Sequence, residues 1–198
     1  MAAGPSAHVE GVLNGAWRQN AAGRSFVVRR RFPPSDTLGP HRLGDFAGTI
    51  ERAASIAGLF GAPGARLPFV FFDLETTGLS GGAGTYAFLV GCGGFDEDGA
   101  FVTEQHLMLD FAGERSMLGL VADDLSRAGA LVTFNGKSFD APVVETRYLF
   151  HRETSPCSAL PHFDVLHPAR RFWGPASDVG CSLATLETQV LGVRRAGD

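Results

Sequence analysis

An apolar run that leads straight into two acids places the tightest limit on the fold. Residues 68–72 read P-F-V-F-F, which is typical of a buried strand, and Asp73 and Glu75 follow at once. Residues i and i+2 of a strand point to the same face, so the two carboxylates are expected side by side. Such a pair is costly unless a positive charge compensates it, and Mg²⁺ or Mn²⁺ suits hard oxygen donors. This segment alone fits equally well with two acids that face water at a strand end.

The segments that follow predict an α/β fold. Three strands joined by short connections predict an antiparallel meander: 68–72, 86–90 and 101–109. Helices and strands then alternate: helix 114–127, strand 130–134, helix 140–151, short strand 162–166 and a last helix 182–191. This order predicts a mixed β-sheet, three antiparallel strands and then αβα units, with flanking helices.

The order of elements also places a third acid near the first two. A βαβ crossover returns to a parallel neighbour, so strand 130–134 should lie beside strand 68–72. Asp140, at the start of the next helix, can then reach the end that carries Asp73 and Glu75. Three carboxylates that converge on one strand end favour a metal site over three solvated acids.

Residues 1–64 are expected to form an N-terminal extension, and residues 65–198 the main domain. The extension has one predicted strand at 26–28, which runs into Arg29-Arg30-Arg31, and a predicted helix over 45–60. An arginine triplet is typical of a solvated strand edge, although it could also contact phosphates.

Composition excludes several classes of protein. The net charge is −4, and Lys137 is the one lysine among 17 basic residues, which argues against diffuse electrostatic binding of nucleic acid. A small, local phosphate site is still compatible with this charge. The three cysteines form no C-x-x-C pair, which argues against a zinc knuckle or a disulfide scaffold. Without a long apolar stretch or a signal-peptide pattern, a cytoplasmic domain with no membrane contact is expected.

Three local motifs point to other chemistry but lack its structural context. Residues 78–82 match G-x-S-x-G, yet no strand leads straight into Ser80 and glycines follow it. Residues 82–87 match G-x-G-x-x-A, yet a strand and not a helix should follow. Residues 136–138 end like a P-loop, yet its first glycine would fall on Leu131, inside a strand. An enzyme with a nucleotide cofactor is therefore the least favoured class.

Two motifs resemble those of a known superfamily. Residues 71–78, F-F-D-L-E-T-T-G, resemble the first motif of the DEDD exonucleases of the ribonuclease H-like superfamily, and residues 135–140, N-G-K-S-F-D, resemble the second. The similarity is closer to the YprB-like ribonuclease H-like group, through D-L-E-T-T-G-L-S-G-G at 73–82 and H-F-D-V-L-H-P-A-R-R at 162–171. It covers about residues 68–198 and implies a ribonuclease H-like mixed sheet.

The resemblance implies a metal-dependent 3′–5′ exonuclease that hydrolyses phosphodiester bonds of single-stranded DNA or RNA with two Mg²⁺ or Mn²⁺ ions. Three residues match acids that are catalytic and metal-binding in the family: Asp73, Glu75 and Asp140. Five more are expected to contact the substrate: Thr76, Thr77, Gly78, Asn135 and Lys137. For Lys137, capping of a local carboxylate is an equal alternative.

A second group of residues is expected near the site but outside its metal ligands: His162, Asp164, Arg170 and Arg171. His162, Asp164 and His167 could form a metal cluster, although a packed hydrogen-bond network is favoured over it. The two arginines could guide a single strand together with the aromatic residues that follow, or could pack their stems on Trp173.

The chain departs from the family pattern at its C-terminal end. The third motif, a His or Tyr followed by the fourth Asp, normally lies downstream of Arg194, and a C-terminally truncated domain is expected from this. The alternative function is therefore a catalytically incomplete module that binds nucleic acid or a protein partner such as a helicase.

Overall fold

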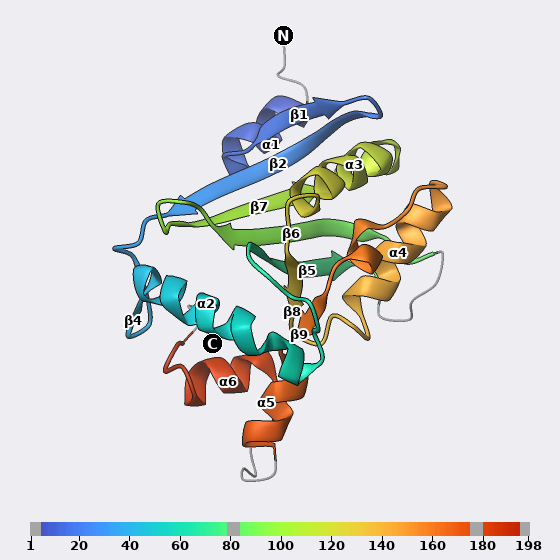
Figure 1. The fold of residues 1–198 in the computed structure, drawn as a ribbon. Helices are drawn as coiled ribbons and strands as arrows, with labels where there is room; N and C mark the ends of the chain where they lie inside the picture. Colours follow the sequence, from blue (N-terminus) through green and yellow to red (C-terminus); the bar gives the residue numbers. More distant parts are fainter. Residues whose placement is uncertain (1–4, 79–83, 175–179, 195–198) are drawn as a thin grey trace.

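A seven-stranded mixed sheet forms the centre of the protein in a computed structural model that describes residues 5–78, 84–174 and 180–194 (Figure 1). The strands follow the order β1-β2-β7-β6-β5-β8-β9 across the sheet. Their bounds are β1 (Ala16–Asn20), β2 (Gly23–Phe32), β5 (Phe69–Thr76), β6 (Ala87–Phe95), β7 (Phe101–Leu107), β8 (Ala130–Thr133) and β9 (His162–Asp164). A separate two-stranded sheet pairs β3 (Thr37–Leu38) with β4 (His41–Arg42).

The sheet confirms the predicted α/β class and its strand order. β5, β6 and β7 are antiparallel neighbours, and β8 and β9 run parallel to β5 on its other side. The crossover through α3 (Glu114–Leu125) returns the chain to a strand beside β5, as expected for a βαβ connection. This mixed order is the one that a ribonuclease H-like fold requires.

Helices cover both faces of the sheet. α3 and α4 (Asp140–Phe150) pack on the face to which Phe72 and Leu74 of β5 point, and the main core lies between them. On the other face, α2 (Phe46–Ile56) packs against Phe69 through Ile50. The remaining helices are α1 (Pro5–Leu13), α5 (Leu166–Trp173), α6 (Leu183–Gln189) and four short 3₁₀ turns at Leu43–Asp45, Ala57–Phe60, Phe111–Gly113 and Pro156–Ala159.

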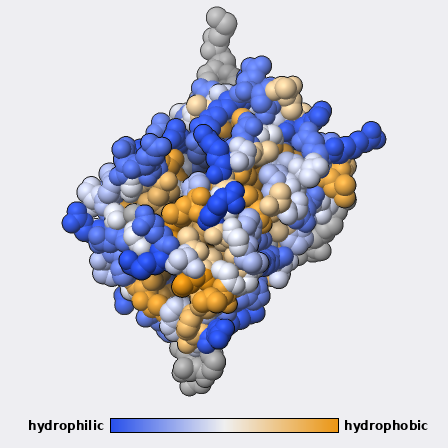
Figure 2. All heavy atoms as spheres, viewed as in Figure 1, coloured by the Kyte–Doolittle hydropathy of each residue, from blue (hydrophilic) through white to orange (hydrophobic). Residues whose placement is uncertain are grey.

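The alternation along β5 separates the core from the candidate site. Phe72 and Leu74 are buried under α3 and α4, whereas Phe71, Asp73 and Glu75 point to the face that carries α2. Figure 2 shows hydrophobic residues gathered across the middle of the side of the molecule seen in Figure 1, surrounded by hydrophilic residues.

The N-terminal region adds to the same sheet. β1 and β2 form an antiparallel hairpin, and β2 pairs with β7 from Phe26 to Phe32. The expected strand at 26–28 is therefore only the middle of a ten-residue strand that continues through the arginine triplet. The sheet runs across the expected boundary at residue 64, and that domain boundary stays a prediction.

Several sequence expectations need adjustment. The helix predicted over 45–60 is confirmed as α2 and the 3₁₀ turn after it, while α1, β1 and α5 were not expected. Parts of the motif matches at 73–82, 78–82 and 82–87, among them Ser80 and Gly82, lie outside the described residues. No helix in the described ranges combines the length and the hydropathy needed to cross a membrane.

Candidate active site

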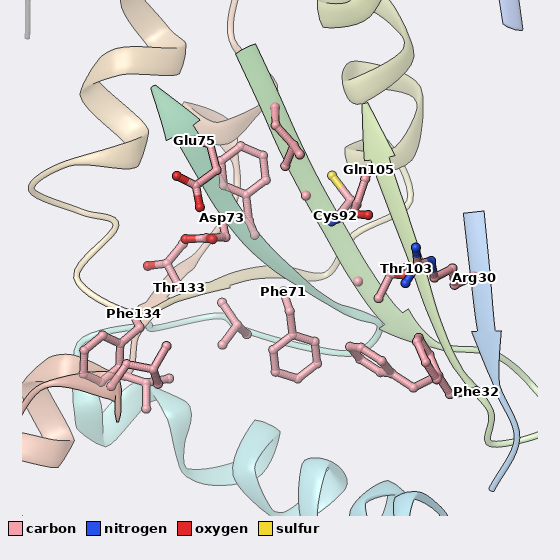
Figure 3. A pocket seen from close by; sticks show the side chains of 18 residues that line it. Arg30, Phe32, Phe71, Asp73, Glu75, Cys92, Thr103, Gln105, Thr133 and Phe134 are labelled. Atoms are coloured by element: carbon pink, nitrogen blue, oxygen red, sulfur yellow. The ribbon is translucent and has the colours of Figure 1, made fainter. Parts of the chain in front are cut away.

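The end of β5 presents two acids on one face of the sheet. Asp73 and Glu75 are both exposed and lie on the same side of the strand, and Figure 3 shows their carboxylates next to each other. β8 runs parallel to β5, with Phe71 opposite Val132. The chain therefore leaves β8 at the same edge of the sheet as the two acids, and the loop that leads to α4 lies beside them.

A cavity of about 300 Å³ brings the three predicted acids together. Asp73 and Glu75 line it from β5, and Asp140 lines it as the first residue of α4. Of the five residues expected to contact substrate, three share the lining: Thr76, Gly78 and Asn135. The predicted convergence of three carboxylates on one strand end is thus present in the structure, while their roles stay a prediction.

The negative charges of these acids act on one another, which is seen in the pKa of Asp140. Burial raises the pKa of Asp140 to about 6, and the negative charges of Asp73, Asp164 and Glu75 raise it in the same direction. Among the described residues that line the cavity, no side chain supplies a positive charge to compensate these carboxylates. Hard oxygen donors with uncompensated negative charge fit Mg²⁺ or Mn²⁺, and a divalent ion there would lower the pKa of Asp140 again.

The loop between β8 and α4 is held by a buried acid. Asp164, only 1% exposed, accepts backbone N–H bonds from Asn135 (2.8 Å), Lys137 (3.0 Å) and Leu166 (3.1 Å). Asn135 has a φ of 67°, a left-handed conformation that Asn tolerates better than most residues. Asp164 therefore fixes the turn that places Asn135 in the cavity and starts α4 at Asp140.

His162 forms one side-chain hydrogen bond among the described residues, and it does not join Asp164 or His167. His162 Nε2 lies 2.8 Å from Thr133 Oγ1, and burial lowers the pKa of His162 together with the nearby charge of Lys137. Asp164 faces the loop, and His167 is exposed on α5. The three residues do not form the metal cluster that the sequence left open, because the described group with close ligand atoms is a different one.

Besides His162 and Asp164, four expected site residues lie outside the cavity of the three acids. Thr77 is exposed, and its Oγ1 accepts the Tyr86 N–H at 3.1 Å. The Lys137 ammonium group donates to the Gly61 carbonyl at 3.2 Å, so its side chain does not cap a carboxylate and that alternative was wrong. Arg170 and Arg171 are exposed in the last turn of α5.

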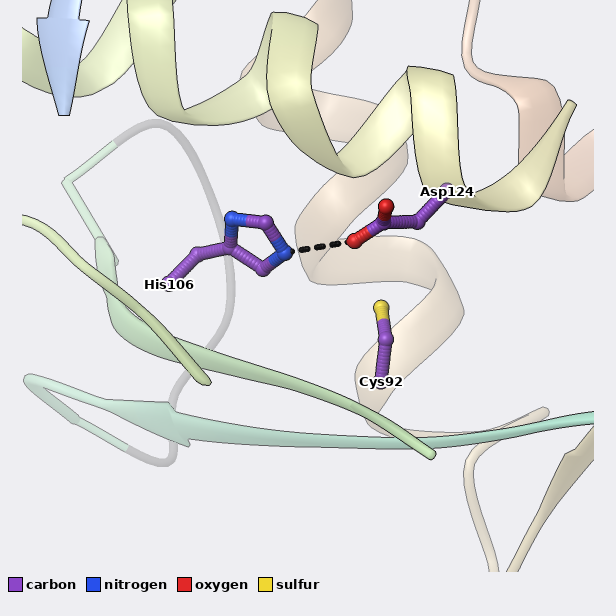
Figure 4. A group of neighbouring side chains, drawn as sticks. All are labelled: Cys92, His106 and Asp124. Atoms are coloured by element: carbon purple, nitrogen blue, oxygen red, sulfur yellow. Dashed lines mark hydrogen bonds and ion pairs between the residues drawn. The ribbon is translucent and has the colours of Figure 1, made fainter. Parts of the chain in front are cut away.

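Sequence reasoning missed a buried cluster on the opposite face of the sheet (Figure 4). Cys92, His106 and Asp124 place a sulfur, a ring nitrogen and a carboxylate oxygen within 4.8 Å of one another, and His106 Nε2 lies 2.8 Å from Asp124 Oδ2. Burial raises the pKa of the Cys92 thiol. Sulfur and nitrogen donors suit zinc-like ions and not Mg²⁺. The predicted strand 86–90 ends before Cys92, whereas the observed β6 extends to Phe95, so sequence alternation would have placed Cys92 beside His106 only with the longer strand.

Comparisons with known proteins agree with this architecture. Residues 70–198 match the family model described as the RNase H superfamily. Over 131 residues, which are 65% of this chain, the sequence is 44% identical to the "Uncharacterized protein YprB" of Bacillus subtilis (strain 168), and it spans only 30% of that protein's length. The family match, the mixed sheet and the 44% identity to YprB assign the chain to the ribonuclease H superfamily, as a YprB-like nuclease-type domain.

Proposed function

We propose that this domain is a metal-dependent 3′–5′ exonuclease that removes nucleotides from single-stranded DNA or RNA. Asp73, Glu75 and Asp140 would hold two Mg²⁺ or Mn²⁺ ions. When bound, such ions supply Lewis-acid stabilisation of the phosphate charge and lower the pKa of a water molecule. The observation that carries the proposal is the cavity in which these three carboxylates meet.

The residues around the acids would position the end of the strand. Asn135 offers an amide group in the same cavity, on a turn that Asp164 holds by hydrogen bonds. The Thr76 hydroxyl donates to the Gly78 carbonyl at 3.0 Å, which orders the backbone next to Glu75. We infer that these groups orient the terminal nucleotide, so that its scissile phosphate lies against the carboxylates.

The wider cavity supports a polymer as the substrate. A second cavity of about 670 Å³ shares Asp73 and Glu75 with the first and continues over β6 and β7. Its volume is about twice that of the first cavity and lies within the range of ligand sites. A strand whose end sits at the acids therefore has room to continue along the sheet.

The test uses the 198-residue chain with single-stranded DNA and RNA oligonucleotides labelled at the 5′ end. Wild-type protein with Mn²⁺ or Mg²⁺ should shorten the strands stepwise from the 3′ end, and chelation should stop the reaction. Asp73→Asn and Asp140→Asn should abolish shortening, while Asp123→Asn, an exposed acid on α3, should leave it unchanged. Equal shortening by wild type and both site variants would overturn the proposal.

A specific result would favour the alternative module. Wild-type protein that binds the oligonucleotides but never shortens them, with either metal, would show a binding domain and would overturn the nuclease. No feature of the described surface points to a helicase partner.

A further inference from the structure

The three consecutive arginines of β2 point to opposite faces of the sheet. Arg29 lies 3.3 Å from Glu104, and Arg31 bonds to Asp96 at 2.8 Å and to Asp98 at 3.1 Å. Arg30, between them, points to the other face, as alternation along a strand requires. Within the described ranges the Arg30 side chain makes no hydrogen bond and no ion pair, although the side chains of both its neighbours are paired with acids.

Arg30 faces the same cavity as the candidate catalytic acids. The cavity of about 670 Å³ has Asp73 and Glu75 at one end and Arg30 and Phe32 at the other (Figure 3). Two glycines of β6 lie between the two ends: Gly91 leaves the floor open, and the Phe101 ring packs directly over Gly93. One continuous surface therefore joins an acidic end to a positively charged end.

The register of the sheet gives the separation of the two ends. Phe71, Gly93, Thr103 and Arg30 lie opposite one another on β5, β6, β7 and β2, and Asp73 is two residues from Phe71. Three steps between neighbouring strands span about 14 Å. Asp73 lies about 7 Å farther along β5 than Phe71, so it is about 16 Å from Arg30 across the sheet. Successive phosphates of a stacked strand advance by about 3.4 Å, so this span corresponds to about four to five nucleotides.

The floor of the cavity suits nucleotide bases. Phe71 and Phe101 line it with ring centroids 5.8 Å apart, and Phe32 lies at the end beside Arg30. Aromatic side chains next to a basic group form the usual surface for single-stranded nucleic acid, since bases stack while the cation contacts the backbone. The acidic end would carry the bound cations, so both ends of the surface would be positive toward phosphate.

We propose that Arg30 binds a backbone phosphate of a single strand about four to five nucleotides from the end held at Asp73 and Glu75. This inference rests on the proposed function, and it adds a contact from outside residues 70–198, the part that matches the family. The N-terminal hairpin thereby becomes part of the substrate-binding surface. Single-stranded nucleic acid is the occupant, because an unpaired guanidinium, an aromatic floor and an acid cluster suited to cations follow one another along one cavity.

The experiment measures binding, so that it does not depend on cleavage. Fluorescence anisotropy with a labelled twelve-nucleotide oligothymidylate, in Ca²⁺ and over a series of salt concentrations, compares wild type with Arg30→Gln. The variant should bind about 3- to 10-fold more weakly. The slope of log affinity against log salt should become shallower by about 0.7, the value for one phosphate contact on a single strand.

Arg29→Gln and Arg31→Gln are the matched controls, because they remove the same charge from neighbouring positions on the opposite face. They should change affinity less than 2-fold. A labelled dinucleotide, too short to reach Arg30, should bind wild type and Arg30→Gln equally. Equal loss in all three variants, or a loss on the dinucleotide as large as on the twelve-mer, would overturn the inference. The nuclease proposal fails separately, through the Asp73 and Asp140 variants.

Discussion

A buried ion pair should anchor the helix that carries Asp140. Glu114, the first residue of α3, is 2% exposed and accepts two bonds of 2.6 Å from the fully buried Arg147 of α4. His151 Nε2 lies 2.7 Å from the same carboxylate, and the Arg147 guanidinium lies over the ring of Tyr86 at 4.2 Å. Glu114→Gln keeps the shape of the side chain but leaves the buried guanidinium without the compensating carboxylate.

The magnitude follows from burial. Removing one partner of a buried pair costs about 3–5 kcal/mol, because a charge then stays buried without compensation. For a domain of this size each kcal/mol lowers the melting temperature by about 2–4 °C, so Glu114→Gln should melt about 6–20 °C lower. Glu153→Gln is the matched control, since it removes the exposed pair with Arg115 beside the same two helices, worth about 0.2–1 kcal/mol.

The pH dependence of stability is a second test of the Glu114–Arg147 pair. Burial acts to raise the pKa of Glu114, but the hydrogen bonds from Arg147 and His151 outweigh it and hold the pKa below the ordinary 4.5. A carboxylate with a lowered pKa in the folded protein contributes its stability above the unfolded value and loses it as pH falls through the folded value. The difference between wild type and Glu114→Gln should therefore be constant above about pH 5 and shrink below it.

The assay is unfolding by heat and by urea, followed by circular dichroism at several pH values. A loss of less than about 1 kcal/mol for Glu114→Gln at pH 7, equal to that of the control, would refute the reasoning. A difference that stays constant down to pH 3 would refute the assignment of the pair to a charged carboxylate.

Two further changes test the site and its floor. Asp164→Asn should lower the free energy of unfolding in urea by about 1–3 kcal/mol, because its amide N–H₂ would face one of the backbone N–H groups of Asn135 or Lys137. Nuclease activity should fall with it. Unchanged stability and activity would contradict this role of Asp164. Gly91→Val should have a melting temperature close to that of wild type, since a Cβ there would lie 3.7 Å from the Asp73 carbonyl. It should nevertheless weaken binding of the twelve-nucleotide oligothymidylate several-fold, because the valine side chain fills the cavity floor. Wild-type affinity would contradict a nucleic-acid strand that crosses β6.

The elements that sequence predicted well are those whose pattern is set by burial. β5 and β8 are continuous apolar runs between two layers, so their sequences alone indicate strands. β1 was missed because Ala16–Asn20 is mostly polar and lies at the edge of the sheet, where pairing and not burial forms the strand. α5 was missed because Pro168 reads as a helix breaker, although a proline in the first turn is compatible with a helix.

The candidate site was predictable only where it follows from strand alternation. Asp73 and Glu75 share a face by the i, i+2 rule, and Asp140 follows from the parallel return of β8. The position of Lys137 was not predictable, because the Asp164 carboxylate fixes a turn that directs its side chain to Gly61. The link between Arg30 and the acids depends on which strand pairs with β7, and the pairing of distant segments leaves no local pattern.

The hairpin of β1 and β2 also changes what the sheet offers to a second copy of the chain. Without it, the seven residues of β7 would form an outer strand, with a row of open N–H and C=O groups to which another molecule can add. The hairpin occupies this row with β2 and ends the sheet in β1, a five-residue strand that carries Arg18 and Gln19. Short, polar outer strands resist such addition. The N-terminal segment therefore also limits edge-to-edge aggregation. We expect a chain that begins at residue 65 to aggregate more readily, because its β7 edge would be open.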